Sequence, residues 1–213
     1  MLLIRHGQSE FNVAFGRDRI DPGITDAPLT ELGRRQARGV AADIARHRDR
    51  QPVSRLICSP YTRALQTAAI VGEMLDLPIS VDPLIRELSA FACDIGTPRA
   101  HLLDRFPAHD FNRVTDEIWW HQHDINGREP EDALHARCRA FVEHMAARED
   151  WAEVAVVTHW GVIRALTGEG VDNCATMRCS PHDILRDGLR PVIAGVAAFD
   201  EPAKPPATPP AAG

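Results

Sequence analysis

The sequence predicts an α/β domain organised around a mainly parallel β-sheet. Short, continuous apolar runs alternate along the chain with longer segments whose apolar residues recur at helical spacing. The chain has 213 residues, and apolar side chains make up 44% of it, which is enough for one sizeable core. We therefore expect a single domain over residues 1–200, followed over 201–213 by a disordered tail rich in Pro and Ala.

Five apolar runs are predicted to be strands. Strands of a parallel sheet are covered by helices on both faces, so their sequences are continuously apolar rather than alternating. The predicted strands are "LLI" (2–4), "RLIC" (55–58), "PISV" (78–81), "VAVVT" (154–158) and "VIAGVAAF" (192–199).

Four segments between and beside these runs have helical periodicity. They are residues 30–47, 59–75, 130–150 and 159–168. Thr30 is expected to be the N-cap of the first of these helices, and Ser59 that of the second, with Pro60 at the first helical position. Gly168 is expected to end the fourth helix, because glycine readily adopts the left-handed conformation of a C-cap.

Residues 88–130 interrupt this alternation. They are rich in His, Asp, Arg and Trp, and we expect an insertion or cap that lies over a site and selects the substrate. In "EIWWHQHD", Trp119 and Trp120 line a pocket or pack in the core, and His121 and His123 alternate as they would on a strand face. No third ligand stands at a recognised spacing, so no metal site is predicted. Four arginines serve a second acidic group of the substrate or are scattered on the surface: Arg99, Arg105, Arg113 and Arg128.

Charge and composition exclude several classes of partner. The formal net charge of −6 disfavours binding to nucleic acid or to an anionic membrane. No apolar stretch is long enough to span a membrane, and no signal peptide precedes the first strand. Five cysteines in no disulfide pattern, Cys174 and Cys179 among them, are expected to be unpaired thiols. Together these features predict a cytoplasmic protein.

Four of the predicted strands end beside charged or imidazole side chains. In an open α/β sheet the carboxyl ends of parallel strands lie at one edge, where ligands bind. We therefore expect these side chains to converge, although more than 150 residues separate the first from the last. They are Arg5 and His6, then Arg63, then Arg86 and Glu87, and finally His159 and Trp160.

These side chains suit phosphoryl transfer. Arg5 and Arg63 supply guanidinium groups for a phosphate, and the place of Arg63 in the first turn of its helix opposes the helix dipole, which indicates a functional reason. A neutral imidazole attacks phosphorus to form a phosphohistidine. Glu87 is the candidate that gives the leaving alkoxide its proton and later takes one from water.

Five segments in this order resemble the histidine phosphatase superfamily, the phosphoglycerate mutase-like proteins. They are "RHGQSEFN", "APLTELGRRQA", "SPYTRALQTA", "IREL" and "VTHWGVIRAL". The resemblance implies a three-layer α/β/α sandwich, mostly parallel with an antiparallel edge strand, and neither a metal nor an organic cofactor.

The resemblance also implies roles for individual residues. His6 is the phosphorylated nucleophile, and Glu87 is the proton donor. Trp160 departs from the family, in which a small residue is common at this place; its indole narrows the pocket, stacks on the substrate or simply packs. The residues expected to bind the phosphoryl group are Arg5, Asn12, Arg63 and His159.

The sequence therefore predicts a phosphomonoesterase for a small phosphorylated substrate. A mutase or phosphotransferase of the same family is the first alternative, and a phosphate-binding scaffold without activity is the second. The chain length favours the shorter phosphatases over the glycolytic mutases. The sequence determines neither the substrate nor the oligomeric state, and a homodimer is one of the oligomeric states that it leaves open.

Overall fold

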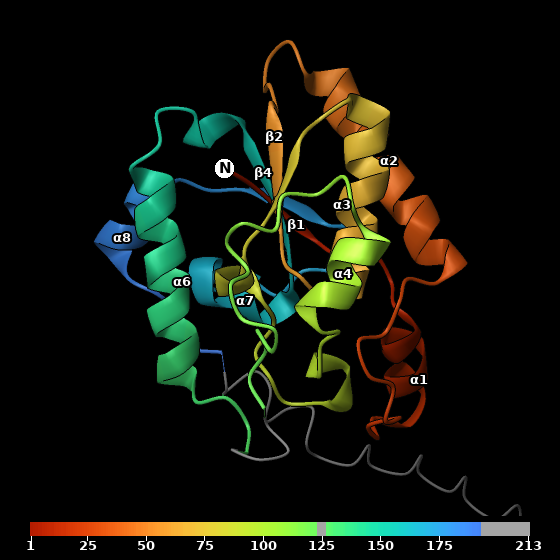
Figure 1. Cartoon of the computed structure of the whole chain (residues 1–213). Helices are drawn as coiled ribbons and strands as arrows, with labels where there is room; N and C mark the ends of the chain where they lie inside the picture. The colour runs from red at the N-terminus through yellow and green to blue at the C-terminus, as the bar shows by residue number, and fades with distance from the viewer. Residues whose placement is uncertain (123–126, 193–213) are drawn as a thin grey trace, which may run out of the picture.

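The computed structural model describes residues 1–122 and 127–192. These residues form a five-stranded sheet with the order β3-β2-β4-β1-β5 (Figure 1). The pairs β1–β4, β2–β4 and β2–β3 are parallel, and β5 pairs antiparallel with β1 at one edge. The strands are β1 (Leu2–Arg5), β2 (Arg55–Cys58), β3 (Ile79–Val81), β4 (Val154–Thr158) and β5 (Thr176–Arg178). The predicted mostly parallel sheet with an antiparallel edge strand is confirmed.

Helices cover both faces of this sheet. Successive side chains of a strand point to opposite faces, so Leu2 and Ile4 join a core cluster with α2 and α3, whereas Leu3 joins a second cluster with α6 and α7. The fold is thus the predicted α/β/α sandwich. On the first face lie α2 (Glu31–His47), α3 (Thr62–Leu75) and α4 (Arg99–Arg105), and on the second α6 (Glu131–Ala146), α7 (Trp160–Thr167) and α8 (Pro181–Asp187).

Helix ends test the predicted caps. The Thr30 side chain accepts a hydrogen bond from the Gly33 backbone N–H, and Gly168 ends α7 with a φ of 84°, so both predictions are confirmed. The prediction for Ser59 and Pro60 is wrong, because α3 begins only at Thr62, with Tyr61 as its N-cap. The Ser59 hydroxyl instead lies 2.7 Å from Nε2 of His159. Ser59 therefore contacts the residue that follows β4 and does not cap α3.

The last strand within the described residues, β5, lies outside all of the predicted strands. β5 has three residues, two of them exposed, and therefore has no apolar run to identify it. The predicted strand over 192–199 lies outside the described residues except for Val192, which is buried, and the predicted tail over 201–213 lies outside them entirely.

Part of the 88–130 region packs in the core, and its beginning lies near the carboxyl ends of the parallel strands. Trp119 is buried and packs edge-on against Tyr61 with ring centroids 4.7 Å apart, so it packs in the core, and Trp120 packs against the same core cluster. The short helix α4 also belongs to that core. The beginning of the region, which includes a 3-10 turn at Ala92–Asp94, lies near the strand ends.

Two further findings concern composition. All five cysteines are free thiols, as predicted. Within residues 1–122 and 127–192, no helix is long and apolar enough to cross a lipid bilayer.

Candidate active site

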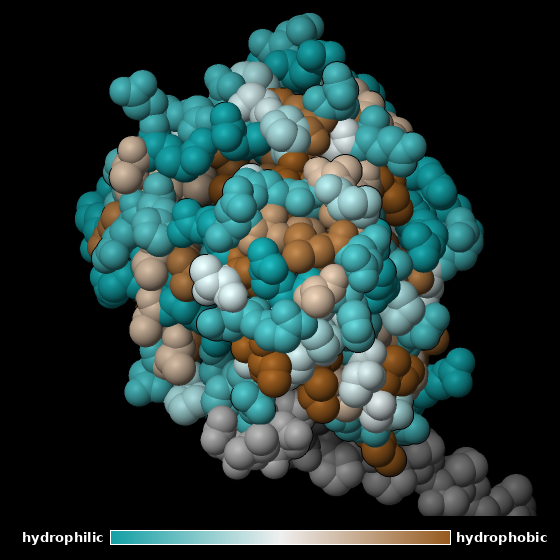
Figure 2. Space-filling model, in the orientation of Figure 1, coloured by the Kyte–Doolittle hydropathy of each residue, from teal (hydrophilic) through white to brown (hydrophobic). Residues whose placement is uncertain are grey.

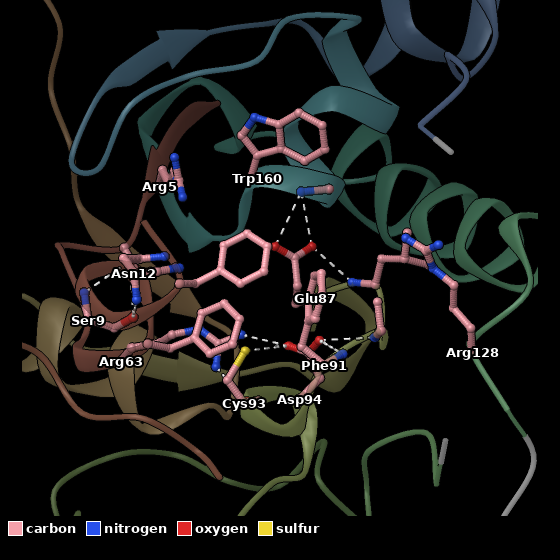
Figure 3. A pocket seen from close by; sticks show the side chains of 16 residues that line it. Arg5, Ser9, Asn12, Arg63, Glu87, Phe91, Cys93, Asp94, Arg128 and Trp160 are labelled. Atoms are coloured by element: carbon pink, nitrogen blue, oxygen red, sulfur yellow. Dashed lines mark hydrogen bonds and ion pairs between the residues drawn. The ribbon is translucent and has the colours of Figure 1, made fainter. Parts of the chain in front are cut away.

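The carboxyl ends of the parallel strands lie level with one another. Arg5 pairs with Thr158, and Cys58 pairs with both Val157 and Val81. The residues that follow these ends therefore meet at one edge of the sheet, where a cavity opens (Figure 3). Six sequence-predicted residues line the cavity: Arg5, His6, Asn12, Arg63, Glu87 and Trp160.

A close approach of two backbones shapes the turn after β1. A Cβ atom on Gly7 would lie 2.5 Å from the backbone oxygen of Gly33, near the start of α2. Any side chain at this position would push α2 away from the turn. The His6 backbone N–H also donates to the Thr158 carbonyl, 3.0 Å away, which continues the ladder past the strand end. Together these contacts fix the direction of the His6 side chain.

His6 is held as a neutral imidazole with a defined tautomer. Its Nδ1 lies 2.8 Å from the Gly7 carbonyl oxygen, which only accepts hydrogen bonds, so Nδ1 carries the proton. Burial, with the positive charges of Arg63 and Arg5, holds the pKa of His6 well below its ordinary value of 6.5. The ring is therefore neutral at pH 7, and its Nε2 has a free lone pair.

His159 lies behind the cavity wall. Its ring centroid is 5.1 Å from that of His6, so the two imidazoles meet as the sequence predicts. Its side chain is fully buried, however, with Nε2 bonded to the Ser59 hydroxyl and the Tyr61 ring packed edge-on against it. Its Nδ1 is buried and has no hydrogen-bond partner within the described residues. Burial and the neighbouring Arg63 also lower the pKa of His159 well below 6.5.

Carbonyl and carboxylate oxygens of the protein hold the two predicted guanidinium groups in place. Nη1 of Arg5 donates to the Val171 carbonyl at 2.7 Å. Arg63 is buried, with Nη1 donating to the Cys93 carbonyl at 2.8 Å and Nη2 paired with the Asp94 carboxylate at 3.0 Å. A guanidinium has five N–H groups, so each arginine keeps donors for an anion in the cavity.

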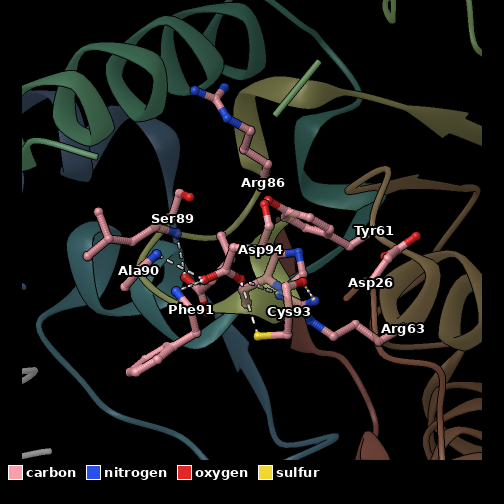
Figure 4. Close-up of polar contacts among 12 residues, drawn as sticks. Asp26, Tyr61, Arg63, Arg86, Ser89, Ala90, Phe91, Cys93 and Asp94 are labelled. Atoms are coloured by element: carbon pink, nitrogen blue, oxygen red, sulfur yellow. Dashed lines mark hydrogen bonds and ion pairs between the residues drawn. The ribbon is translucent and has the colours of Figure 1, made fainter. Parts of the chain in front are cut away.

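Asp94 connects Arg63 to the segment that follows Glu87. Its second carboxylate oxygen accepts hydrogen bonds from the backbone N–H groups of Ala90 and Phe91, at 3.0 and 3.1 Å (Figure 4). Tyr61 donates its hydroxyl to the Asp94 carbonyl at 2.7 Å. Sequence reasoning missed Asp94, because nothing in its spacing marks it apart from the other acidic residues of 88–130.

Glu87 is a carboxyl group with a raised pKa at the centre of the cavity. It accepts hydrogen bonds from the backbone N–H groups of Leu88 at 2.9 Å and Gly161 at 3.0 Å. Burial, and next the negative charge of Asp94, raise the pKa of Glu87 to about 7, although Arg63 and Arg5 oppose the rise. A side chain at Gly161 would displace this carboxylate, since a Cβ would lie 2.5 Å from Oε1 of Glu87.

A buried arginine on α6 holds the backbone at Glu87. Arg137 donates to the carbonyl oxygens of Leu84, Arg86 and Glu87, the last at 3.0 Å. It also pairs through Nε and Nη2 with both oxygens of the buried Glu129, at 2.9 Å each. This pair was also missed, because Arg137 stands beside the apolar stripe of its helix, and its partners are determined only by the tertiary fold.

Asn12 and Trp160 complete the predicted set. The Oδ1 of Asn12 accepts hydrogen bonds from the Ser9 backbone N–H and from the Asn173 side chain. The side-chain NH2 group of Asn12 is therefore the part left to bind a ligand in the cavity. Trp160 is half-buried, begins α7 and borders the cavity next to Gly161.

Of the four arginines in the 88–130 region, Arg128 lines the cavity, whereas Arg113 pairs with Asp82 at 2.9 Å. His121 is bonded to the Gly127 carbonyl oxygen, and His123 lies outside the described residues. In the part of the chain that the structure describes, no three His, Cys, Asp or Glu side chains are grouped to hold a metal ion.

Comparison with known proteins identifies the family. The chain matches the histidine phosphatase superfamily (branch 1) over residues 1–177. It is 30% identical over 191 residues to a glucosyl-3-phosphoglycerate phosphatase of Mycolicibacterium vanbaalenii, covering 81% of this chain and 76% of the relative. It is 29% identical over 177 residues to a protein named putative phosphoserine phosphatase 2 of Hydrogenobacter thermophilus, covering 81% of each chain.

Solved structures agree with this match. A mycobacterial glucosyl-3-phosphoglycerate phosphatase in complex with VO3 superposes with a TM-score of 0.55 and 27% identity, covering 83% of this chain and 88% of that one. The chain therefore belongs to the histidine phosphatase superfamily, and the prediction of a phosphatase of this family is confirmed. The roles of individual residues are proposals.

Proposed function

We propose that this protein hydrolyses phosphomonoesters through a covalent phosphohistidine at His6, with Glu87 as the proton donor. The observation that carries the proposal is the state of His6, whose Nδ1 proton is bonded to the Gly7 carbonyl and whose Nε2 lone pair is free beside two guanidinium groups. That combination gives a neutral nucleophile at the site where a phosphate is bound.

In the first step, Nε2 of His6 forms a bond to phosphorus while the bond from phosphorus to the ester oxygen breaks. The ring gains a positive charge, which the hydrogen bond from Nδ1 to the Gly7 carbonyl stabilises. Arg5 and Arg63 neutralise the phosphoryl oxygens, and the amide of Asn12 donates to one of them. His159 packs beside the nucleophile, with its ring centroid 5.1 Å from that of His6.

Glu87 moves the protons of both steps. Its raised pKa of about 7 keeps a large fraction protonated near neutral pH, so it gives its proton to the leaving alkoxide. The resulting carboxylate then takes a proton from water as the water oxygen attacks phosphorus. The bond from nitrogen to phosphorus breaks, its electron pair returns to Nε2, and inorganic phosphate leaves with Glu87 protonated again.

A mutase would return the phosphoryl group to a second hydroxyl instead of to water. The chain is 38% identical over 87 residues to a probable phosphoglycerate mutase GpmB of Yersinia pestis, but this match covers only 41% of the chain. Hydrolysis is therefore the function we propose for a small phosphorylated substrate, and product analysis separates the two reactions.

Leaving-group dependence tests the proposal. Glu87→Gln keeps the shape of the side chain but cannot donate the proton, so kcat for an alkyl phosphate should fall about 100-fold or more, and kcat for 4-nitrophenyl phosphate much less. Glu73→Gln, at an exposed carboxylate on α3, is the matched control. Equal losses on both esters would contradict the acid role, and an isomerised ester in place of free phosphate would contradict hydrolysis.

A further inference from the structure

Apolar side chains form the wall of the cavity around Glu87. Phe11 and Phe15 of α1 (Glu10–Asp18) pack in a cluster with Phe91, with ring centroids between 5.0 and 5.5 Å apart. We call these three residues the phenylalanine cluster. Leu88, Ala90 and Trp160 line the same cavity. Figure 2 shows hydrophobic residues exposed over α1 and the segment that precedes α4.

Two of these aromatic side chains are positioned for contact with a ligand. Phe11 and Phe15 are buried and form the base of the wall, whereas Phe91 and Trp160 are only half-buried. Phe91 and Trp160 lie on opposite sides of the Glu87 carboxylate in Figure 3. The backbone N–H of Phe91 donates to Asp94, and its ring packs against those of Phe11 and Phe15, so the ring has a defined place.

The proposed chemistry places the leaving group between these two rings. Glu87 gives its proton to the ester oxygen, so the carbon skeleton attached to that oxygen begins beside Glu87. Phe91 and Trp160 line the same cavity and are available to contact that skeleton.

Two polar residues of the cavity lining, Asp94 and Ser9, are already engaged with the protein. The carboxylate of Asp94 is bonded to Arg63 and to two backbone amides, and the Ser9 hydroxyl donates to Asn12. A polyol would find no hydrogen-bonding group on the three phenyl rings and would lose bound water there, which is unfavourable. An aromatic ring would instead gain ring-to-ring contacts and remove apolar surface from water.

We propose that this cavity selects phosphate esters of alcohols that carry an aromatic ring, bound between Phe91 and Trp160. This inference rests on the proposed function and names its substrate class. It separates the chain from relatives whose names specify glucosyl-3-phosphoglycerate or phosphoserine, which are polar and charged. Arg128 lines the cavity as well, so preference for a second acidic group is the competing outcome.

Two esters with similar leaving alkoxides test the proposal. The ratio of kcat/KM for 2-phenylethyl phosphate to that for ethyl phosphate reports the ring alone, because both alkoxides need the same proton. The wild-type ratio should be about tenfold or more. Phe91→Ala should bring the ratio close to one, and Phe91→Leu, which keeps apolar volume without a flat ring, should give an intermediate ratio.

Phe106→Ala is the matched control, since Phe106 is a half-buried phenylalanine at the end of α4, away from this cavity, and the ratio should stay at its wild-type value. Equal kcat/KM for the two esters, or a higher kcat/KM for phosphoserine than for 2-phenylethyl phosphate, overturns this inference and leaves the proposed function intact. Turnover of none of these esters would instead overturn the proposed function itself.

Discussion

Replacing Glu87 by Gln should change how the stability of the protein depends on pH. The folded protein raises the pKa of this carboxyl from 4.5 to about 7, chiefly through burial. Since one pKa unit corresponds to about 1.4 kcal/mol, the rise corresponds to at most about 3.5 kcal/mol. This energy is a preference of the folded state for the protonated carboxyl.

The sign of the effect follows from proton binding. Between the two pKa values, the unfolded chain releases the Glu87 proton while the folded protein keeps it, so wild-type stability falls as the pH rises through this window. The glutamine side chain of the variant carries no such proton. The free energy of unfolding of Glu87→Gln minus that of the wild type should therefore increase by about 2 kcal/mol between about pH 5 and about pH 8.

Urea titration measures this difference. The four tryptophans report unfolding by fluorescence, and the free energy is determined for both proteins at several pH values. Glu73→Gln, at an exposed carboxylate, should give a curve parallel to the wild type. Parallel curves for Glu87→Gln and wild type would refute the argument that burial keeps this carboxyl protonated.

Other substitutions test the surroundings of Glu87. Gly161→Ala should displace the Glu87 carboxylate and lower kcat for alkyl esters about tenfold or more, whereas Gly39→Ala, where a Cβ meets nothing within 4 Å, should not. Asp94→Asn removes a negative charge that raises the Glu87 pKa, so the basic limb of the kcat/KM profile should move to lower pH; an unmoved limb would contradict this coupling. Arg137→Met removes one of the two arginines paired with the buried Glu129 and should lower the free energy of unfolding by about 3 kcal/mol; unchanged urea midpoints would count against that role.

The sheet and the convergence of its strand ends could be predicted because the relevant signals are local. A buried parallel strand is continuously apolar, so β2 and β4 stand out in the sequence, and the residues after them are then placed by topology. β5 could not be found in this way, because it is a three-residue edge strand with exposed side chains. The wrong cap at Ser59 has a related cause, since its hydroxyl is bound to His159, a hundred residues away.

The supporting residues of the site depend on the tertiary fold. Asp94 pairs with Arg63 of α3, and Arg137 donates to backbone carbonyls around Glu87; no periodicity or motif encodes such distant partners. The burial of the His159 side chain is likewise determined by Tyr61 and Ser59, which pack around its ring. Local patterns thus locate the reactive groups, while the contacts that orient them appear only in three dimensions.

The central claim is that His6 carries the phosphoryl group during turnover. Wild-type protein mixed with a phosphomonoester labelled in its phosphate, and quenched rapidly in alkali, should retain label that is stable to base and released by acid. His6→Ala, with an unchanged melting temperature, should retain no label and release no phosphate. Rapid turnover by the wild type without such label, or phosphate release by His6→Ala at the wild-type rate, would contradict the account.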